Sequence, residues 1–253
     1  MYDVVQYNQS PWLKPYIDFN TEMRKNSKNE FEKDFFKLMN NSVFGKTMEN
    51  VRNRMQMHLT SDYDNAVKWQ TMQHFKQGKT LFGLYMLEMY KKEVILDKPI
   101  YVGTTILDLS KLAMMKFHYD VIETEFKDRY ELLYSDTDSL VYWIFTDDIY
   151  KWKQSKKEHF DLSDCALDLL KDNTNKKIVG KMKDELNCLP MKEFIALNPK
   201  VYSYKYDKPD QPDKNVKKLK GVSKAVVKNN ITHSDYIHTM ENETKLERET
   251  IGI

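Results

Sequence analysis

The strongest constraint on the fold is a pair of strand-like segments around a short polar turn. The segment Glu131-Leu-Leu-Tyr134 is followed by Ser-Asp-Thr-Asp-Ser139 and then by Leu140-Val-Tyr-Trp-Ile-Phe145. β-Branched and aromatic residues on both sides of a polar turn are typical of a hairpin with buried strands. The sequence therefore predicts two antiparallel strands with Asp136 and Asp138 at their tip.

Two helices are predicted, from about Asn29 to Asn50 and from about Thr105 to Tyr119, the first with a capping box of Ser27 and Glu30. Apolar and small residues at helical spacing predict their core faces, which comprise Phe31, Phe35, Leu38 and Ser42 in the first helix and Ile106, Leu109, Ala113 and Phe117 in the second. The segments Leu81–Tyr90 and Pro99–Val102 are expected to be strands. Because helices and strands mix without regular alternation, the expected class is α+β, or an elaborated α/β layer.

The composition is that of a folded protein, since 41% of the 253 residues are hydrophobic and 31% are charged. No apolar run approaches the roughly eighteen residues that span a bilayer, and Met1–Ser10 carries no signal pattern. Cys165 and Cys188 are too few and too far apart for a disulfide framework or a zinc site. We therefore expect neither secretion nor a membrane role.

The formal charge of +2 conceals three charge blocks. The segment from Lys176 to Lys228 contains fourteen lysines and six acids, and the segment from Arg24 to Arg54 contains eight basic residues and four acids. The segment from Asp120 to Asp172 contains fourteen acids and seven basic residues. Such blocks are often solvated surfaces, but basic segments around an acidic one also suit a polyanion site with metal-binding carboxylates.

Asp136 and Asp138 are candidate Mg²⁺ ligands, because two carboxylates this close repel each other unless a cation lies between them. Taken alone, the motif is more typical of an Asp-rich turn that bonds its own backbone. A calcium loop is excluded, since Leu140 and Val141 stand where an oxygen ligand and a glycine are required.

The predicted first helix carries a second stripe, formed by Lys33, Lys37, Asn41 and Phe44 and followed by Gly45. Lysines there are usually solvated, yet a cation, an amide and a ring in line could bind a triphosphate and pack on a base pair. Gly45 would permit close approach of a nucleic acid or of another backbone segment.

Lys200-Val-Tyr202 alternates basic and aromatic residues, which suits contact with a phosphate backbone and stacking. An ordinary edge strand is the alternative. The segment Asp207–Asn215, with Pro209 and Pro212, is expected to be a linker.

Together these motifs resemble family B DNA polymerases, specifically the protein-primed branch of Maverick/Polinton transposons and some viruses. Residues 37–45 resemble the fingers motif Lys-x-x-x-Asn-Ser-x-Tyr-Gly, residues 134–139 match the palm motif Tyr-x-Asp-Thr-Asp-Ser, and residues 200–202 resemble Lys-x-Tyr. The segments at 106–111 and 220–224 also look like the transposon branch.

The resemblance implies a right-hand polymerase palm sheet with helical fingers and a small thumb, without the N-terminal exonuclease region. Residues 1–58 would be fingers-like, residues 59–205 the palm with an insertion at about 59–80, and residues 206–253 thumb-like. The implied partners are primer–template DNA, deoxynucleoside triphosphates and a terminal protein primer, although priming by nucleic acid stays open. The protein would be intracellular, and nuclear if the transposon is eukaryotic.

The implied site residues fall into three groups. Asp136 and Asp138 would be catalytic ligands of two Mg²⁺ ions. The residues that would bind the nucleotide are Lys25, Lys37, Asn41, Phe44 and Gly45. The residues that would contact DNA are Tyr134, Thr137, Lys200, Tyr202, Lys217, Lys218, Lys220 and Lys224.

Two departures qualify this resemblance. Phe44 replaces the usual tyrosine, which puts any hydrogen bond from that position in doubt. The palm motif Asp-x-x-Ser-Leu-Tyr-Pro, which supplies the partner carboxylate, does not occur before Lys37. We therefore expect a gene fragment, a partial gene model or a degenerate transposon copy that is inactive alone, with a non-catalytic nucleic-acid-binding relic as the alternative.

Overall fold

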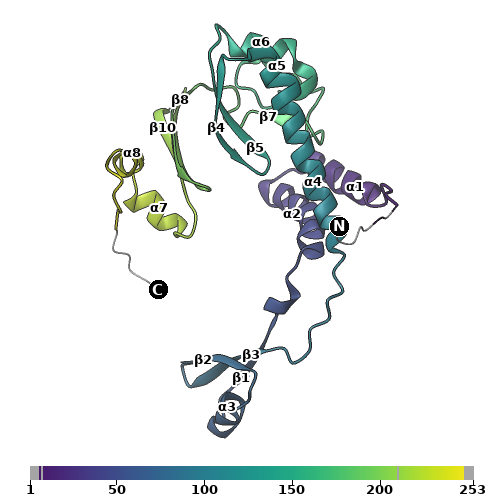
Figure 1. The fold of residues 1–253 in the computed structure, drawn as a ribbon, viewed down its shortest axis with the longest axis vertical. Coiled ribbons are helices and arrows are strands. Elements are labelled where there is room, and N and C mark those ends of the chain that lie inside the picture. The colour runs from purple at the N-terminus through teal and green to yellow at the C-terminus, as the bar shows by residue number, and fades with distance from the viewer. Residues whose placement is uncertain (1–5, 7, 210, 248–253) are drawn as a thin grey trace, which may run out of the picture. The chain divides into compact units, whose positions relative to one another are not determined.

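The structure is a computed structural model that describes residues 6, 8–209 and 211–247, so most of residues 1–10 lies outside it. Helices are combined with several small sheets, which confirms the α+β class. The chain divides into two units, residues 1–108 and 109–253, with the boundary inside one long helix (Figure 1). The three-part division implied by the resemblance stays a prediction.

The first unit begins with helices α1 (Lys14–Asn26) and α2 (Glu30–Thr47), which pack against each other. Asn29 caps α2, because its side-chain oxygen accepts a hydrogen bond of 2.8 Å from the main-chain N–H of Glu32. The Ser27 hydroxyl instead donates to the Met23 carbonyl at the end of α1. The predicted capping box was therefore wrong by two residues.

Helix α2 buries a different face from the predicted one. Phe31, Phe35 and Leu38 are 79%, 46% and 62% exposed. The less exposed positions are Phe36, Met39, Asn40, Val43 and Thr47, of which Met39 accepts a hydrogen bond from α1 and Asn40 donates one to it. The buried stripe is shifted by one residue from the predicted one.

A three-stranded antiparallel sheet and one helix follow α2 in this unit. The strands, in the order β1-β3-β2, are β1 (Met55–Thr60), β3 (Leu84–Tyr90) and β2 (Phe75–Leu81). The 3₁₀ turn η1 (Val51–Asn53) precedes β1, and α3 (Tyr63–Gln70) packs on the sheet, where Ala66, Leu87 and Met89 are buried. The predicted strand Leu81–Tyr90 is confirmed from Leu84 onward, since Phe82 and Gly83 form a turn with positive φ.

The second predicted helix begins five residues earlier than expected. Helix α4 (Ile100–Lys116) continues into the π-helix η2 (Phe117–Glu123) and then α5 (Thr124–Phe126). The predicted strand Pro99–Val102 was wrong, because Pro99 directly precedes the helix, where its missing N–H removes no helical bond. The predicted core face was wrong for Ile106, Leu109 and Ala113, which are exposed, whereas Phe117 packs against a buried cluster as predicted.

The second unit contains the predicted hairpin, β4 (Tyr130–Asp136) and β5 (Ser139–Ile144). Its strands are less buried than expected, since Leu132, Leu133 and Trp143 are exposed. The smaller elements that follow are α6 (Ile149–Ser155), η3 (Lys157–His159), β6 (Phe160–Asp161), η4 (Asp168–Leu170) and β7 (Met182–Lys183), with β6 and β7 parallel.

The last sheet is antiparallel with the order β10-β9-β8, formed by β8 (Met191–Asn198), β9 (Val201–Lys208) and β10 (Gln211–Leu219). Helices α7 (Lys224–Asn230) and α8 (His233–Asn242) follow it (Figure 1). Because side chains alternate along a strand, one face carries Ile195, Val201 and Leu219, which pack against Ile231 and Tyr236.

The predicted linker Asp207–Asn215 is instead part of this sheet, although Asp210 lies outside the described residues. Pro212 is tolerated because β10 is an edge strand whose pairing with β9 is irregular between Gln211 and Lys214.

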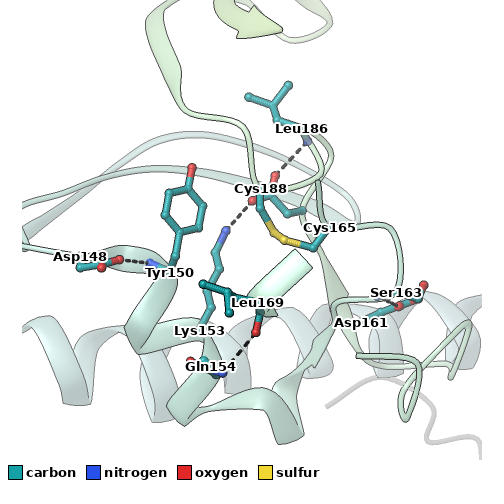
Figure 2. The surroundings of a disulfide bond; sticks show 11 residues. Asp148, Tyr150, Lys153, Gln154, Asp161, Ser163, Cys165, Leu169, Leu186 and Cys188 are labelled. Atoms are coloured by element: carbon teal, nitrogen blue, oxygen red, sulfur yellow. Dashed lines mark hydrogen bonds and ion pairs between the residues drawn. A yellow bond between two sulfur atoms is a disulfide. The ribbon is translucent and has the colours of Figure 1, made fainter. Parts of the chain in front are cut away.

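Cys165 and Cys188 form a disulfide, contrary to the expectation from their spacing (Figure 2). Their Cα atoms lie 5.2 Å apart, and both residues are buried in a cluster with Phe160, Leu162 and Leu170. Beside it, the Lys153 ammonium pairs with Asp184. The fold brings the two cysteines together across 23 residues of sequence.

Candidate functional site

The tip of the β4–β5 hairpin is a tight two-residue loop. Asp136 pairs with Ser139 across it, which leaves Thr137 and Asp138 at the turn. Thr137 has a φ of 50°, a conformation that β-branched residues rarely adopt. The Asp136 carbonyl accepts hydrogen bonds from the Asp138 N–H at 2.6 Å and from the Ser139 hydroxyl at 3.1 Å. Short polar side chains thus close a turn that holds two neighbouring carboxylates.

A second hairpin tip, between β8 and β9, contacts the first. The Lys200 ammonium lies 2.6 Å from Asp136 Oδ2, and the Lys200 main-chain N–H donates to the Tyr134 hydroxyl at 2.9 Å. Lys200 has a φ of 63°, so this tip also uses a left-handed residue. Two motifs that are 64 residues apart in the sequence therefore meet at one place.

The ion pair changes the titration of both partners. The Lys200 ammonium, helped by the Thr137 hydroxyl, holds the pKa of Asp136 below its usual value, although partial burial opposes the shift. Asp136 in turn raises the pKa of Lys200. Both groups therefore stay charged over the neutral pH range.

Aromatic rings support the contact between the two tips. The Tyr134 ring lies 5.1 Å from Tyr202 and 6.0 Å from Phe194, measured between ring centroids. Burial raises the pKa of Tyr202, and nearby Tyr134 and Asp136 raise it further. Tyr202 therefore remains a neutral ring packed beside the carboxylates.

Asp136 and Asp138 fit only part of a magnesium site. Their carboxylates are the hard-oxygen ligands that Mg²⁺ prefers. Among residues 6, 8–209 and 211–247, however, no group of three or more His, Cys, Asp or Glu side chains is arranged to hold a metal ion. A complete site would need at least one further carboxylate or substrate phosphate oxygens.

The residues assigned to nucleotide binding all lie in the first unit. Lys37, Asn41 and Gly45 are exposed on α2, whereas Phe44 is partly buried. A Cβ atom added at Gly45 would meet nothing within 4 Å, so its surroundings are open. Lys25 is exposed in the last turn of α1.

The lysines between residues 217 and 224 that were assigned to DNA contact differ from one another. Lys217 donates its ammonium hydrogens to the main-chain carbonyls of Lys228 and Ile231, which ties β10 to the last turn of α7 and the residue that follows the helix. Lys218, Lys220 and Lys224 are exposed. Lys217 therefore has a structural role that its neighbours do not share.

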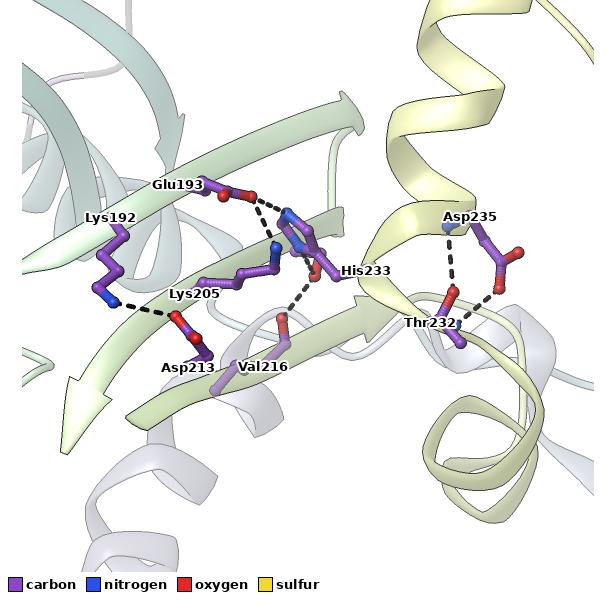
Figure 3. A network of polar contacts seen from close by, with 9 residues as sticks. Lys192, Glu193, Lys205, Asp213, Val216, Thr232, His233 and Asp235 are labelled. Carbon is purple, nitrogen blue, oxygen red and sulfur yellow. Dashed lines mark hydrogen bonds and ion pairs between the residues drawn. The ribbon is translucent and has the colours of Figure 1, made fainter. Parts of the chain in front are cut away.

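Sequence reasoning missed two groups of residues in this sheet. Tyr204 and Tyr206 continue the row of rings that begins at Tyr202, and the spacing of two between these tyrosines was a usable signal. On the other face, His233 is buried and bonds Ser203 at 2.7 Å and Glu193 at 3.0 Å (Figure 3). No sequence pattern pointed to that network.

No known protein family, no curated protein and no solved structure matches the chain. In the described part of the chain, no helix is both long and apolar enough to cross a membrane.

Proposed function

We propose that the chain is the fingers, palm and thumb part of a family B DNA polymerase of the protein-primed branch. Such an enzyme joins deoxynucleotides to a primer in the order set by a template strand. The main support is the contact between Lys200 and Asp136, because it joins the two motifs that resemble the Lys-x-Tyr and Tyr-x-Asp-Thr-Asp-Ser motifs. A chance pair of motifs has no reason to meet in the fold.

Each motif residue then has a chemical role. Asp138 and Asp136 would hold Mg²⁺, which, when bound, activates the primer 3′-hydroxyl and stabilises the charge on the transferred phosphoryl group. Lys37, with Lys25 as a second cation, would neutralise the triphosphate. Asn41 would orient the nucleotide.

The remaining contacts are to DNA. Phe44 would pack on the new base pair, next to the open surface at Gly45. Lys200 and Tyr202 would hold the primer strand beside the carboxylates, with Tyr134 and Thr137 completing that surface. The exposed lysines Lys218, Lys220 and Lys224 would follow the duplex phosphates, which gives binding that weakens as salt rises.

A non-catalytic DNA-binding protein of the same descent is the second candidate. It is favoured by the fact that Asp136 already has a cationic partner in Lys200, and that the described residues provide no third acid for a metal site. Such a protein would bind DNA without extending it.

Primer extension with Mg²⁺ and deoxynucleoside triphosphates separates the two candidates. The chain is assayed alone and also joined to a segment that carries Asp-x-x-Ser-Leu-Tyr-Pro. Each of these two forms is compared with its Asp138→Asn variant. The Asp147→Asn variant, which changes an exposed aspartate, is the matched control. Extension by the joined form that only Asp138→Asn abolishes supports the polymerase. DNA binding without extension supports the second candidate. The absence of both DNA binding and extension rejects both candidates. Efficient extension by the chain alone would contradict its expected inactivity.

A further inference from the structure

The β8–β10 sheet has one face covered by α8 and another lined with aromatic rings. Tyr202, Tyr204 and Tyr206 alternate along β9 and share the second face with Phe194, their neighbour on β8. Ring centroids are 6.3 Å apart between Tyr202 and Tyr204 and 6.1 Å apart between Tyr204 and Tyr206. The strand therefore presents a continuous row of rings.

This aromatic face is distinct from the core of the sheet. The cluster around Ile195, Ile231 and Tyr236 lies on the other face, which α8 covers. All three tyrosines on β9 remain partly exposed. Tyr134 lies against Tyr202 and Phe194 at one end of the row, and the rings of Tyr204 and Tyr206 each keep part of their surface exposed.

Lysines of the edge strand border the row. In the register of β10 with β9, Lys214 stands opposite Tyr206 and Lys218 opposite Tyr202, so both lysines lie on the aromatic face. Within residues 6, 8–209 and 211–247, no acid pairs with the ammonium group of Lys214 or of Lys218. Lys217, which alternates to the other face, is bound to main-chain carbonyls instead.

The electrostatic surroundings leave the rings neutral. Burial, reinforced by the neighbouring tyrosines and by Glu185, raises the pKa of Tyr204 to about 12. Glu185 is exposed near this face, and the charge of Asp136 at its end is balanced by Lys200. Neutral rings beside ammonium groups that no described acid pairs with suit a polyanion with flat, apolar groups.

We propose that the aromatic face binds a single, unpaired DNA strand, with Tyr204 and Tyr206 stacking on bases and Lys214 and Lys218 contacting phosphates. The choice of DNA rests on the proposed function. The strand must be unpaired, because the faces of bases inside a duplex are already stacked on each other. Stacking on rings tolerates any base, so binding is expected to show little sequence preference.

Binding of a labelled oligothymidylate to the full chain, measured by fluorescence anisotropy without Mg²⁺ or nucleotides, tests this proposal. We expect Tyr204→Ala and Tyr206→Ala each to weaken binding about tenfold, whereas Tyr204→Phe retains it. Lys214→Gln and Lys218→Gln should each reduce the slope of log affinity against log salt by about 0.7. Tyr119→Ala and Lys151→Gln, which alter exposed residues elsewhere in the second unit, serve as controls and should change neither quantity.

Two outcomes would overturn the proposal. They are unchanged affinity for the oligothymidylate in both alanine variants, and tighter binding of an RNA strand of the same length. If an alanine variant fails to fold, photo-crosslinking of a bromouracil-containing oligonucleotide to the unmodified chain decides, since the adduct must map to Tyr204 or Tyr206. Because no catalysis is measured, strand binding by these rings can succeed where primer extension fails, and the reverse.

Discussion

Lys200 and Asp136 form an ion pair, with 2.6 Å between Nζ and Oδ2, that joins the tips of two hairpins. The pair places a cation on one of the two carboxylates assigned to metal binding. Under the proposed function, a metal ion at Asp136 must compete with the ammonium group or rearrange it. The side chain of Lys200 is half exposed, so such movement would meet little steric resistance.

Lys200→Met should raise the pKa of Asp136 toward its usual value of 3.8, because the largest cause of its lowered pKa is removed. The Thr137 hydroxyl, which stays, should leave part of the shift. A carboxyl-carbon NMR titration measures the change. Lys220→Met is the matched control and should have a smaller effect, since Lys220 acts on Asp136 only through its charge. Equal pKa values in wild type and Lys200→Met would contradict the ion pair.

His233→Ala should destabilise the second unit by about 2 kcal/mol, because it removes a buried ring that bonds both Ser203 and Glu193. Ser203 is fully buried, so water cannot easily replace the lost partner. Urea unfolding measures the difference. His238→Ala, on the exposed side of the same helix, should change stability by less than about 0.5 kcal/mol. A similar loss in both variants would show that helix packing, rather than this network, is responsible.

Asp161 should make stability depend on pH in the acid range. Its burial acts to raise its pKa, but hydrogen bonds from the Lys177 N–H at 2.9 Å and the Ser163 N–H at 3.0 Å outweigh burial, and the pKa is lowered below 3.8. A lowered carboxyl pKa stabilises the fold above pH 3.8, and this contribution is lost as the pH falls through the folded-state value.

Asp161→Asn should therefore lower the free energy of unfolding at neutral pH, and its difference from wild type should shrink as the pH falls below 3.8. Denaturant unfolding at several pH values measures this convergence. Asp147→Asn, at an exposed position, is the control and should follow wild type throughout. A constant difference at all pH values would refute the assigned cause.

The Cys165–Cys188 disulfide should contribute about 3 kcal/mol, because it closes a loop of 23 residues in the unfolded chain. A reductant should lower the denaturation midpoint of wild type. It should leave the double variant Cys165→Ala, Cys188→Ala unchanged, since that variant has no bond to break. Identical midpoints of wild type with and without reductant would show that the bond does not stabilise the protein.

The features that were predicted correctly from the sequence depend on residues that are close together along the chain. The hairpin carrying Asp136 and Asp138 was predicted because β-branched and aromatic residues on both sides of a polar turn are local signals. The helix carrying Lys37 was predicted for the same reason. The exposed face of that helix was not predicted, because Phe35 and Phe36 are equally apolar and only the tertiary packing makes Phe36 the less exposed of the two.

The sequence by itself determined the α+β class, the hairpin and the residue types at its tip, since these follow from local patterns and turn chemistry. Tertiary structure alone decided that Lys200 meets Asp136, that Cys165 meets Cys188, and that Tyr204 and Tyr206 lie on the face of their sheet opposite α8. Each of these relations joins or orients segments distant in sequence. They depend on which surfaces the folded chain brings together, and no local pattern encodes that choice.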